Sequence, residues 1–149
     1  MKPAAAGVRV SSAHADVDRD LVYAFISDSY WAKGIPRATF ERALAGSICF
    51  SAFVDEGGGE AQVGFARVVS DRATFAYLAD VFVLPSHRGR GIADRIMEAV
   101  AAHPDLQGLR RWVLVTRDAH RLYAKHGWKP LATPDLYMEL WDPGVYARG

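Results

Sequence analysis

Arginine and glycine alternate over residues 88–91, a composition suited to holding a phosphate group. The stretch follows an apolar run of strand composition over 75–84 and precedes a run over 92–100 whose apolar residues recur at helical spacing. A loop between a strand and the N-terminus of a helix presents backbone N–H groups and a positive dipole to an anion. Because glycines let the anion approach the backbone and arginines add charge, the segment predicts a pyrophosphate-binding loop.

A turn without a ligand is the alternative, because Gly-Arg turns also occur where helices begin. The dinucleotide pattern G-x-G-x-x-G is absent, since position 94 is Asp. The Lys-Ser/Thr ending of the P-loop is absent as well. The composition of the loop therefore leaves both interpretations open.

Asp80 is the second candidate for a functional residue. It lies inside the apolar run 78–83, where a carboxylate is costly unless it is paired or belongs to a site. Because this run leads into the glycine loop, Asp80 is a candidate general base. A salt bridge to an arginine is the alternative, and the sequence favours neither.

The glycine loop lies within a longer signature. Residues 83–93 read Val-Leu-Pro-Ser-His-Arg-Gly-Arg-Gly-Ile-Ala. This segment resembles the V-x-P-x-x-R-G-x-G-[IL]-[GA] pattern of the GNAT superfamily, the acyl-CoA-dependent N-acyltransferases. The core of that pattern, [RQ]-x-x-G-x-[GA], is met by Arg88, Gly91 and Ala93. The resemblance favours phosphate binding over a purely structural turn.

A second segment resembles the same family. Residues 119–128 read Ala-His-Arg-Leu-Tyr-Ala-Lys-His-Gly-Trp, similar to A-x-x-L-Y-x-x-x-G-F with Trp128 at the aromatic position. This pattern is typical of a short helix that ends at Gly127 and returns to a strand. The two segments lie in the expected order, and the resemblance covers about residues 60–130 well and the N-terminal third only in outline.

The resemblance implies an enzyme that moves the acetyl group of acetyl-CoA directly to a primary amine of a small molecule or peptide, through a ternary complex. Such a transfer needs a neutral amine, stabilisation of an oxyanion and a proton for the leaving thiolate. It requires no metal and no covalent enzyme intermediate. Two alternatives remain: a non-catalytic acyl-CoA-binding or sensing module, and an interaction protein whose glycine loop is structural.

The cofactor contacts of the family fall on the strand, the loop and the start of the helix. The backbones of Val81 and Val83 are expected to pair with the pantetheine arm as a neighbouring strand would. Thr116 stands where relatives often carry Asn, and a hydroxyl lacks the paired donor and acceptor of an amide. The resemblance implies these acetyl-CoA contacts: Val81, Phe82, Val83, Arg88, Gly89, Arg90, Gly91, Ile92, Ala93 and Thr116.

Tyr123 falls on the general-acid position of the second segment, where its hydroxyl would face the CoA sulfur; packing between helix and sheet is the alternative. Asp80 would take the proton of the amine. Tyr30, Trp31 and Tyr77 are the predicted acceptor-binding residues, because an aromatic wall suits a small amine with an apolar or cationic part. Trp31 could instead simply cap the core.

Composition sets the remaining expectations. The 149 residues predict a single domain, 1–149, with loose tails at 1–6 and 143–149. A net charge of +1 offers no general attraction to nucleic acid or membrane. The single cysteine, Cys49, excludes a disulfide framework, and its alternating apolar surroundings predict a buried strand residue. No apolar stretch approaches the ~20 residues of a membrane span, so we expect a cytoplasmic enzyme. The surplus of apolar residues predicts a homodimer.

The expected order of the helices and strands that position these residues predicts an α/β fold of the α+β type. We expect a mixed, mostly antiparallel central sheet flanked by helices, with a splayed strand pair before the glycine loop. Two helices are expected between a cap at Asp16 or Asp18 and Leu44, one between residue 92 and Pro104, and one that bears Tyr123. The expected strands are 8–11, 48–54, 62–69, 74–83, 112–116, 128–131 and 136–141.

Overall fold

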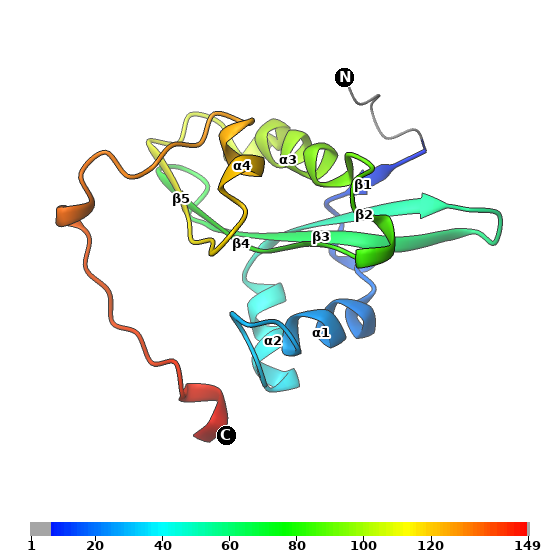
Figure 1. The fold of residues 1–149 in the computed structure, drawn as a ribbon, viewed down its shortest axis with the longest axis horizontal. Coiled ribbons are helices and arrows are strands. Elements are labelled where there is room, and N and C mark those ends of the chain that lie inside the picture. Colours follow the sequence, from blue (N-terminus) through cyan, green and yellow to red (C-terminus); the bar gives the residue numbers. More distant parts are fainter. Residues whose placement is uncertain (1–6, 149) are drawn as a thin grey trace.

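One five-stranded sheet forms the centre of the molecule (Figure 1). The structure, a computed structural model, describes residues 7–148. The strands follow one another in chain order, antiparallel from β1 to β4 and parallel between β4 and β5. Their bounds are β1 (Arg9–Ser11), β2 (Ile48–Asp55), β3 (Glu60–Ser70), β4 (Phe75–Val83) and β5 (Arg111–Leu114). The expected mixed, mostly antiparallel sheet is confirmed.

Helices cover both faces of this sheet (Figure 1). The pair α1 (Arg19–Ser27) and α2 (Arg37–Ala45) lies on one face, and α3 (Ile92–Ala102) and α4 (His120–Ala124) lie on the other. Of the two expected caps, Asp18 begins α1, because its side chain accepts a hydrogen bond from the backbone N–H of Leu21 at 3.2 Å.

Two apolar clusters fill the layers on either side of the sheet. The cluster under α3 includes Ile96 and Val100 of that helix with Val68 and Leu78 of the sheet. The other cluster joins the buried faces of α1 and α2 to the opposite side of the sheet: Val22, Ile26, Phe40, Leu44, Cys49 and Phe65. Burial raises the pKa of the Cys49 thiol to about 11, so this thiol stays protonated at neutral pH and is a poor nucleophile.

The glycine at position 64 lets α3 lie close against β3. A Cβ atom at Gly64 would come within 2.9 Å of Ile96 Cδ1 and 3.2 Å of the Phe82 carbonyl oxygen. The absence of a side chain therefore allows the helix to approach the sheet at the level of the end of β4. This approach places the N-terminus of α3 beside the loop that follows β4.

The expected splayed pair is formed by β4 and β5. Their parallel pairing extends only to Leu78 opposite Leu114. Beyond Leu78, β4 continues to Val83 with β3 as its partner, while the chain after Leu114 leads toward α4. The β5-facing edge of β4 is therefore unpaired, within the described chain, over its last residues.

A bulge occurs in β4 where the splay begins. Between the pairs Arg67–Ala79 and Phe65–Phe82, β4 has one more residue than β3. Asp80 lies in this bulge with a φ of 56°, a left-handed conformation that Asp adopts more readily than most residues. A bulge redirects side chains, and here it redirects a carboxylate.

The two final strands predicted at 128–131 and 136–141 are wrong. Pro130 has no N–H to donate to a ladder, and residues 128–131 form no strand. Pro134–Leu136 forms a 3-10 turn, and the chain then runs without a strand partner among the described residues, away from the sheet (Figure 1). Val145–Arg148 closes a second 3-10 turn within the segment expected to be a loose tail; residues 1–6 and 149 lie outside the described range.

Candidate active site

A hollow of about 590 Å³ lies beside the unpaired end of β4. We call it the β4 hollow; its walls are the end of β4, the start of α3, the segment before and within α4, and the turn after α1. Its volume is in the range of small-molecule and cofactor sites. The predicted residues that line it are Tyr30, Trp31, Val81, Phe82, Val83, Arg88, Gly89, Gly91, Ile92, Ala93 and Tyr123.

Four predicted site residues do not line the hollow. They are Tyr77, Asp80, Arg90 and Thr116. The Thr116 hydroxyl accepts a hydrogen bond from the backbone N–H of Ala119 at 3.0 Å, so it stabilises the turn before α4. Tyr77 is half-buried on β4, where burial raises the pKa of its hydroxyl.

The glycine loop opens the N-terminus of α3 to the hollow. Gly89 and Gly91 have φ values of 78° and 77°, a conformation that costs glycine little. Gly91 is the N-cap of α3, and no side chain accepts a hydrogen bond there. A Cβ atom at Gly89 would meet no other atom within 4 Å. The first N–H groups of α3 and the space before them can therefore receive an anion.

Side chains hold the loop from both sides. Arg88 donates from Nε to the carbonyl oxygen of Val83 at 3.1 Å, which ties the loop to the end of β4. On the outside, Glu56 from the β2–β3 turn pairs with Arg90 at 3.7 Å and accepts a hydrogen bond from His87. The hydrogen bond from His87 lowers the pKa of Glu56, so this carboxylate stays charged.

The unpaired edge of β4 forms the long wall of the hollow. Val81, Phe82 and Val83 line it. The ring of Phe82 stacks on that of Phe25 from α1 with centroids 3.9 Å apart. This stacking packs the end of β4 against α1, and pairing with β3 keeps this end of the strand extended.

Tyr123 lies on α4, only 8% exposed, with its ring lining the hollow. Burial raises the pKa of its hydroxyl to about 12, and nearby Tyr30 adds to the shift. Within residues 7–148, no other residue donates a hydrogen bond to this hydroxyl or accepts one from it. The hydroxyl therefore carries its proton at neutral pH.

Asp94 fixes α4, and with it Tyr123, against the start of α3. Asp94 accepts from His126 Nε2 at 2.8 Å and pairs with Lys125 at 3.1 Å. Burial opposes the ionisation of Asp94, but the hydrogen bonds from His126 and Lys125 prevail and lower its pKa. The tyrosine is therefore held by charge pairs as well as by its contact with Trp128, whose ring centroid lies 6.1 Å away.

Asp80 already has two partners. Arg67 Nε donates to one carboxylate oxygen at 2.7 Å, and Trp31 Nε1 donates to the other at 2.7 Å. The ion pair is mostly buried, with 17% of the Arg67 side chain and 11% of the Asp80 side chain exposed. The geometry corresponds to the salt bridge that the sequence left open, and it orients Trp31 toward the hollow.

Tyr30 closes the hollow on the side of the predicted acceptor wall. Its hydroxyl accepts from the backbone N–H of Arg117 at 3.2 Å, and the Arg117 guanidinium lies 3.8 Å from the Tyr30 ring centroid. The Trp31 ring packs edge-on against Tyr30 at 5.1 Å. Sequence reasoning did not assign Phe25 to the site, because no local motif marks it; it reaches the hollow through tertiary contacts.

No clear metal site accompanies this hollow. Within residues 7–148, no group of three or more His, Cys, Asp or Glu side chains is placed to hold a metal ion. The same residues include no helix with the length and hydropathy needed to cross a bilayer.

Comparison with known proteins agrees with this fold and site. Residues 45–130 match the family described as the acetyltransferase (GNAT) domain. A GNAT-family protein from Xanthomonas campestris pv. campestris, an inferred acetyltransferase of known crystal structure, is 51% identical, with a TM-score of 0.89 over 99% of each chain.

Two further proteins are similar to this chain at lower identity. An inferred acetyltransferase from Gibberella zeae is 33% identical over 137 residues, which cover 80% of this chain and 72% of the relative. A Mycobacterium tuberculosis protein solved in complex with CoA is 23% identical, with a TM-score of 0.60 over 80% of this chain and 70% of that one. The chain therefore belongs to the GNAT family of acetyltransferases.

Proposed function

We propose that this protein transfers the acetyl group of acetyl-CoA directly to a primary amine of a small molecule or peptide, within a ternary complex. One observation carries the proposal: the open N-terminus of α3, the unpaired edge of β4 and the hydroxyl-bearing ring of Tyr123 all line one hollow. Family membership supports acetyl transfer as the chemistry.

Acetyl-CoA would lie along the hollow in a fixed order. Its pyrophosphate would bind the N–H groups at Gly89–Gly91 and the start of α3, where the helix dipole favours negative charge. Its pantetheine arm would run along Val81–Val83 and make the hydrogen bonds that β5 would make if it continued along β4. The CoA bound to the Mycobacterium tuberculosis relative supports the ligand class. This order brings the thioester toward Tyr123.

The chain's own residues then supply the proton chemistry. A neutral amine attacks the thioester carbonyl, a C–N bond forms, and a tetrahedral oxyanion develops. When this intermediate collapses, the C–S bond breaks and the sulfur leaves with the electron pair. The Tyr123 hydroxyl would give its proton to that thiolate and recover one from solvent.

Asp80 is the proposed acceptor of the amine proton. To act so, it must exchange the Trp31 hydrogen bond for one to the amine or to a bridging water, because both carboxylate oxygens are occupied. Arg67 would remain paired and keep the carboxylate oriented. Tyr30 and Trp31 would then hold the acceptor against the thioester, with Tyr77 supporting them from β4.

A non-catalytic acyl-CoA-binding module is the second candidate. The occupied carboxylate of Asp80 favours it, since no uncommitted base faces the β4 hollow among the predicted residues. Such a module keeps the glycine loop and binds acetyl-CoA without consuming it.

A panel of primary amines separates the two candidates. Calorimetry measures acetyl-CoA binding, and a thiol reagent measures CoA release with each amine. An enzyme binds acetyl-CoA and releases thiol only with its acceptor. Binding without release for every amine supports the module, and the absence of binding overturns both.

The cellular location belongs to the same proposal. We propose that the protein acts in the cytoplasm; its one cysteine, Cys49, is buried and unpaired, as in proteins that do not rely on disulfides. Fractionation of cells that express the tagged protein tests this location.

A further inference from the structure

The cationic side chains of the β4 hollow differ in how the chain already holds them. Among the described residues that line this hollow, four can carry a positive charge: His87, Arg88, Arg117 and Lys125. His87 bonds to Glu56 on the outside of the glycine loop. Arg88 donates to the carbonyl oxygen of Val83 at 3.1 Å. Lys125 pairs with Asp94 at 3.1 Å. These three contacts hold the loop and α4 in place, so the fourth cation, Arg117, is the one whose position still needs an explanation.

Arg117 is held against an aromatic ring. Its guanidinium lies 3.8 Å from the Tyr30 ring centroid, and its backbone N–H donates to the Tyr30 hydroxyl. The structure also pairs it with its chain neighbour Asp118 at 3.9 Å, and the two side chains are 65% and 72% exposed. So exposed a pair contributes little to stability, so a carboxylate from a ligand can replace Asp118. The ring thus holds a guanidinium whose planar set of N–H donors suits a carboxylate.

The Arg117–Tyr30 pair lies at the end of the hollow where the acetyl group would be transferred. Tyr30 contributes to the raised pKa of Tyr123, so the two phenols lie near each other. Tyr30 also packs edge-on against Trp31, whose indole N–H donates to Asp80. Asp80 lies three residues before the end of β4, which is roughly 10 Å of strand before the glycine loop begins. An anion at Arg117 would therefore lie beside the reacting groups and not at the site expected for the pyrophosphate.

The charge at this end of the hollow disfavours a cationic acceptor. A face of the Tyr30 ring, which could attract a cation, is occupied by the Arg117 guanidinium. The nearby carboxylate of Asp80 is already neutralised by its ion pair with an arginine. The same wall includes the apolar rings of Phe25 and Trp31. An acceptor that fits all of these groups has an anionic group and an apolar part besides its amine.

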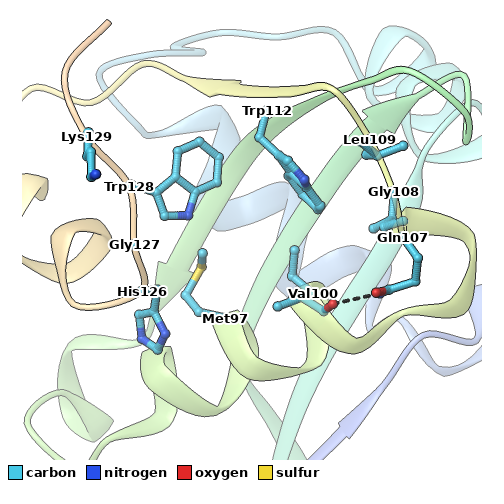
Figure 2. A pocket seen from close by; sticks show the side chains of 12 residues that line it. Met97, Val100, Gln107, Gly108, Leu109, Trp112, His126, Gly127, Trp128 and Lys129 are labelled. Atoms are coloured by element: carbon cyan, nitrogen blue, oxygen red, sulfur yellow. Dashed lines mark hydrogen bonds between the residues drawn. The ribbon is translucent and has the colours of Figure 1, made fainter. Parts of the chain in front are cut away.

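Another hollow of the molecule has aromatic side chains without this guanidinium. It lies beside β5 and has a volume of about 480 Å³. Trp112 and Trp128 line it, with ring centroids 6.0 Å apart (Figure 2). Of the described residues that line it, none is an arginine. Aromatic walls therefore occur in both hollows, and the arginine held on a tyrosine ring is what distinguishes the one beside β4.

We propose that the acceptor is a free amino acid with an apolar side chain, and that Arg117 binds its carboxylate. The proposal rests on the proposed acetyl transfer and names the acceptor. The carboxylate accepts hydrogen bonds from the guanidinium, and the apolar side chain lies against Trp31 and Phe25. The amine nitrogen forms a bond to the acetyl carbon, and the C–S bond breaks. The amine loses one proton and the thiolate gains one, so the products are an N-acetyl amino acid and CoA. A peptide has no carboxylate next to its terminal amine and is disfavoured.

Matched acceptors test the role of the carboxylate. Leucine, methionine, phenylalanine and tryptophan are each compared with their amide and their decarboxylated amine, at equal concentrations of neutral amine. Thiol release from acetyl-CoA gives kcat/KM for each acceptor. The best amino acid should exceed its amide and its decarboxylated amine roughly tenfold or more, because only the carboxylate pairs with the guanidinium. Release without a preference for the carboxylate overturns this inference and leaves the proposed function standing. Release with no acceptor at all overturns the proposed function and the inference with it.

A matched pair of arginines tests the residue itself. Arg117→Met should raise KM for the amino acid roughly tenfold or more and remove the preference over the amide, with unchanged acetyl-CoA affinity. Arg117→Lys restores the charge without the planar fork and should restore part of the preference. Arg121 is exposed on α4 and does not line the hollow, so Arg121→Met should keep the full preference. Weaker acetyl-CoA binding by Arg117→Met in calorimetry, or equal losses of preference in both methionine variants, overturns the inference.

Discussion

The end of β4 and the outer edge of β5 both lack a strand partner within residues 7–148, and the side chains around these two edges differ in kind. Beside the end of β4, the vacancy is bounded by two glycines of positive φ, an uncapped helix N-terminus and a tyrosine hydroxyl. Beside β5, it is bounded by tryptophan, methionine and valine side chains. Both expose backbone that can pair with an extended ligand. The edge of β4 therefore has the groups that a polar, anionic cofactor needs, and the edge of β5 does not.

Removal of the acid from the β4 hollow should have the largest effect. Tyr123→Phe should lower kcat by roughly 10²-fold with unchanged acetyl-CoA affinity, because only the transition state uses the hydroxyl. Tyr23→Phe is the matched control, since Tyr23 lies on α1 and does not line the hollow. Steady-state kinetics and calorimetry measure the two quantities. Full turnover by Tyr123→Phe would mean that water delivers the proton and that the ring only packs.

The glycine loop should be the next most sensitive element. Gly89→Leu should weaken acetyl-CoA binding roughly tenfold or more, because its side chain would occupy the space expected for the pyrophosphate. Gly59→Leu in the β2–β3 turn is the control; Gly59 also has a positive φ, 96°, and open space around it. Equal losses for the two folded variants, measured by calorimetry, would attribute the effect to backbone strain and contradict a phosphate site.

A smaller, pH-dependent effect is expected at Asp80. Asp80→Asn should slow turnover several-fold near neutral pH and less at alkaline pH, where amines are already neutral and a base is needed less. Trp31→Phe removes one hydrogen bond to the carboxylate without removing the carboxylate, so its defect should not depend on pH. A pH-independent defect in Asp80→Asn would identify Asp80 as a residue that only positions Trp31.

Burial of Tyr123 should also appear in stability at high pH. Its pKa is raised from 10 to about 12 in the folded protein, so only the unfolded chain loses this proton between these values. The stabilisation is complete below pH 10 and is lost as pH rises toward 12. The Tm of the wild type should therefore fall more steeply over this range than that of Tyr123→Phe. If Tm fell equally with pH in the wild type and in Tyr123→Phe, the result would contradict the raised pKa of Tyr123.

The parts of the site that follow from local sequence were predictable. The glycine loop, the cap at Asp18 and the short helix α4, which ends at Ala124 three residues before Gly127, each depend on residues a few positions apart. Their positions relative to the strands follow from the spacing of two family segments. The residues predicted from these segments line the β4 hollow, apart from Arg90 and Thr116.

The parts that failed depend on contacts between distant segments. Asp80 contacts Arg67 and Trp31 because a bulge in β4 redirects its side chain, and no local sequence pattern predicts that bulge. In the second predicted C-terminal strand, 136–141, Leu136, Met138 and Leu140 alternate with other residues as they would in a strand. The sequence did not indicate that Pro130 removes the first strand and that the second has no strand partner within residues 7–148. Alternation predicts the face of a strand but does not identify its partner.

A crystal structure of the full-length chain with bound CoA tests the central proposal most directly. We expect the pyrophosphate at Gly89–Gly91 and the pantetheine arm along Val81–Val83, with the CoA sulfur near the Tyr123 hydroxyl. CoA bound outside the β4 hollow would contradict the proposed site.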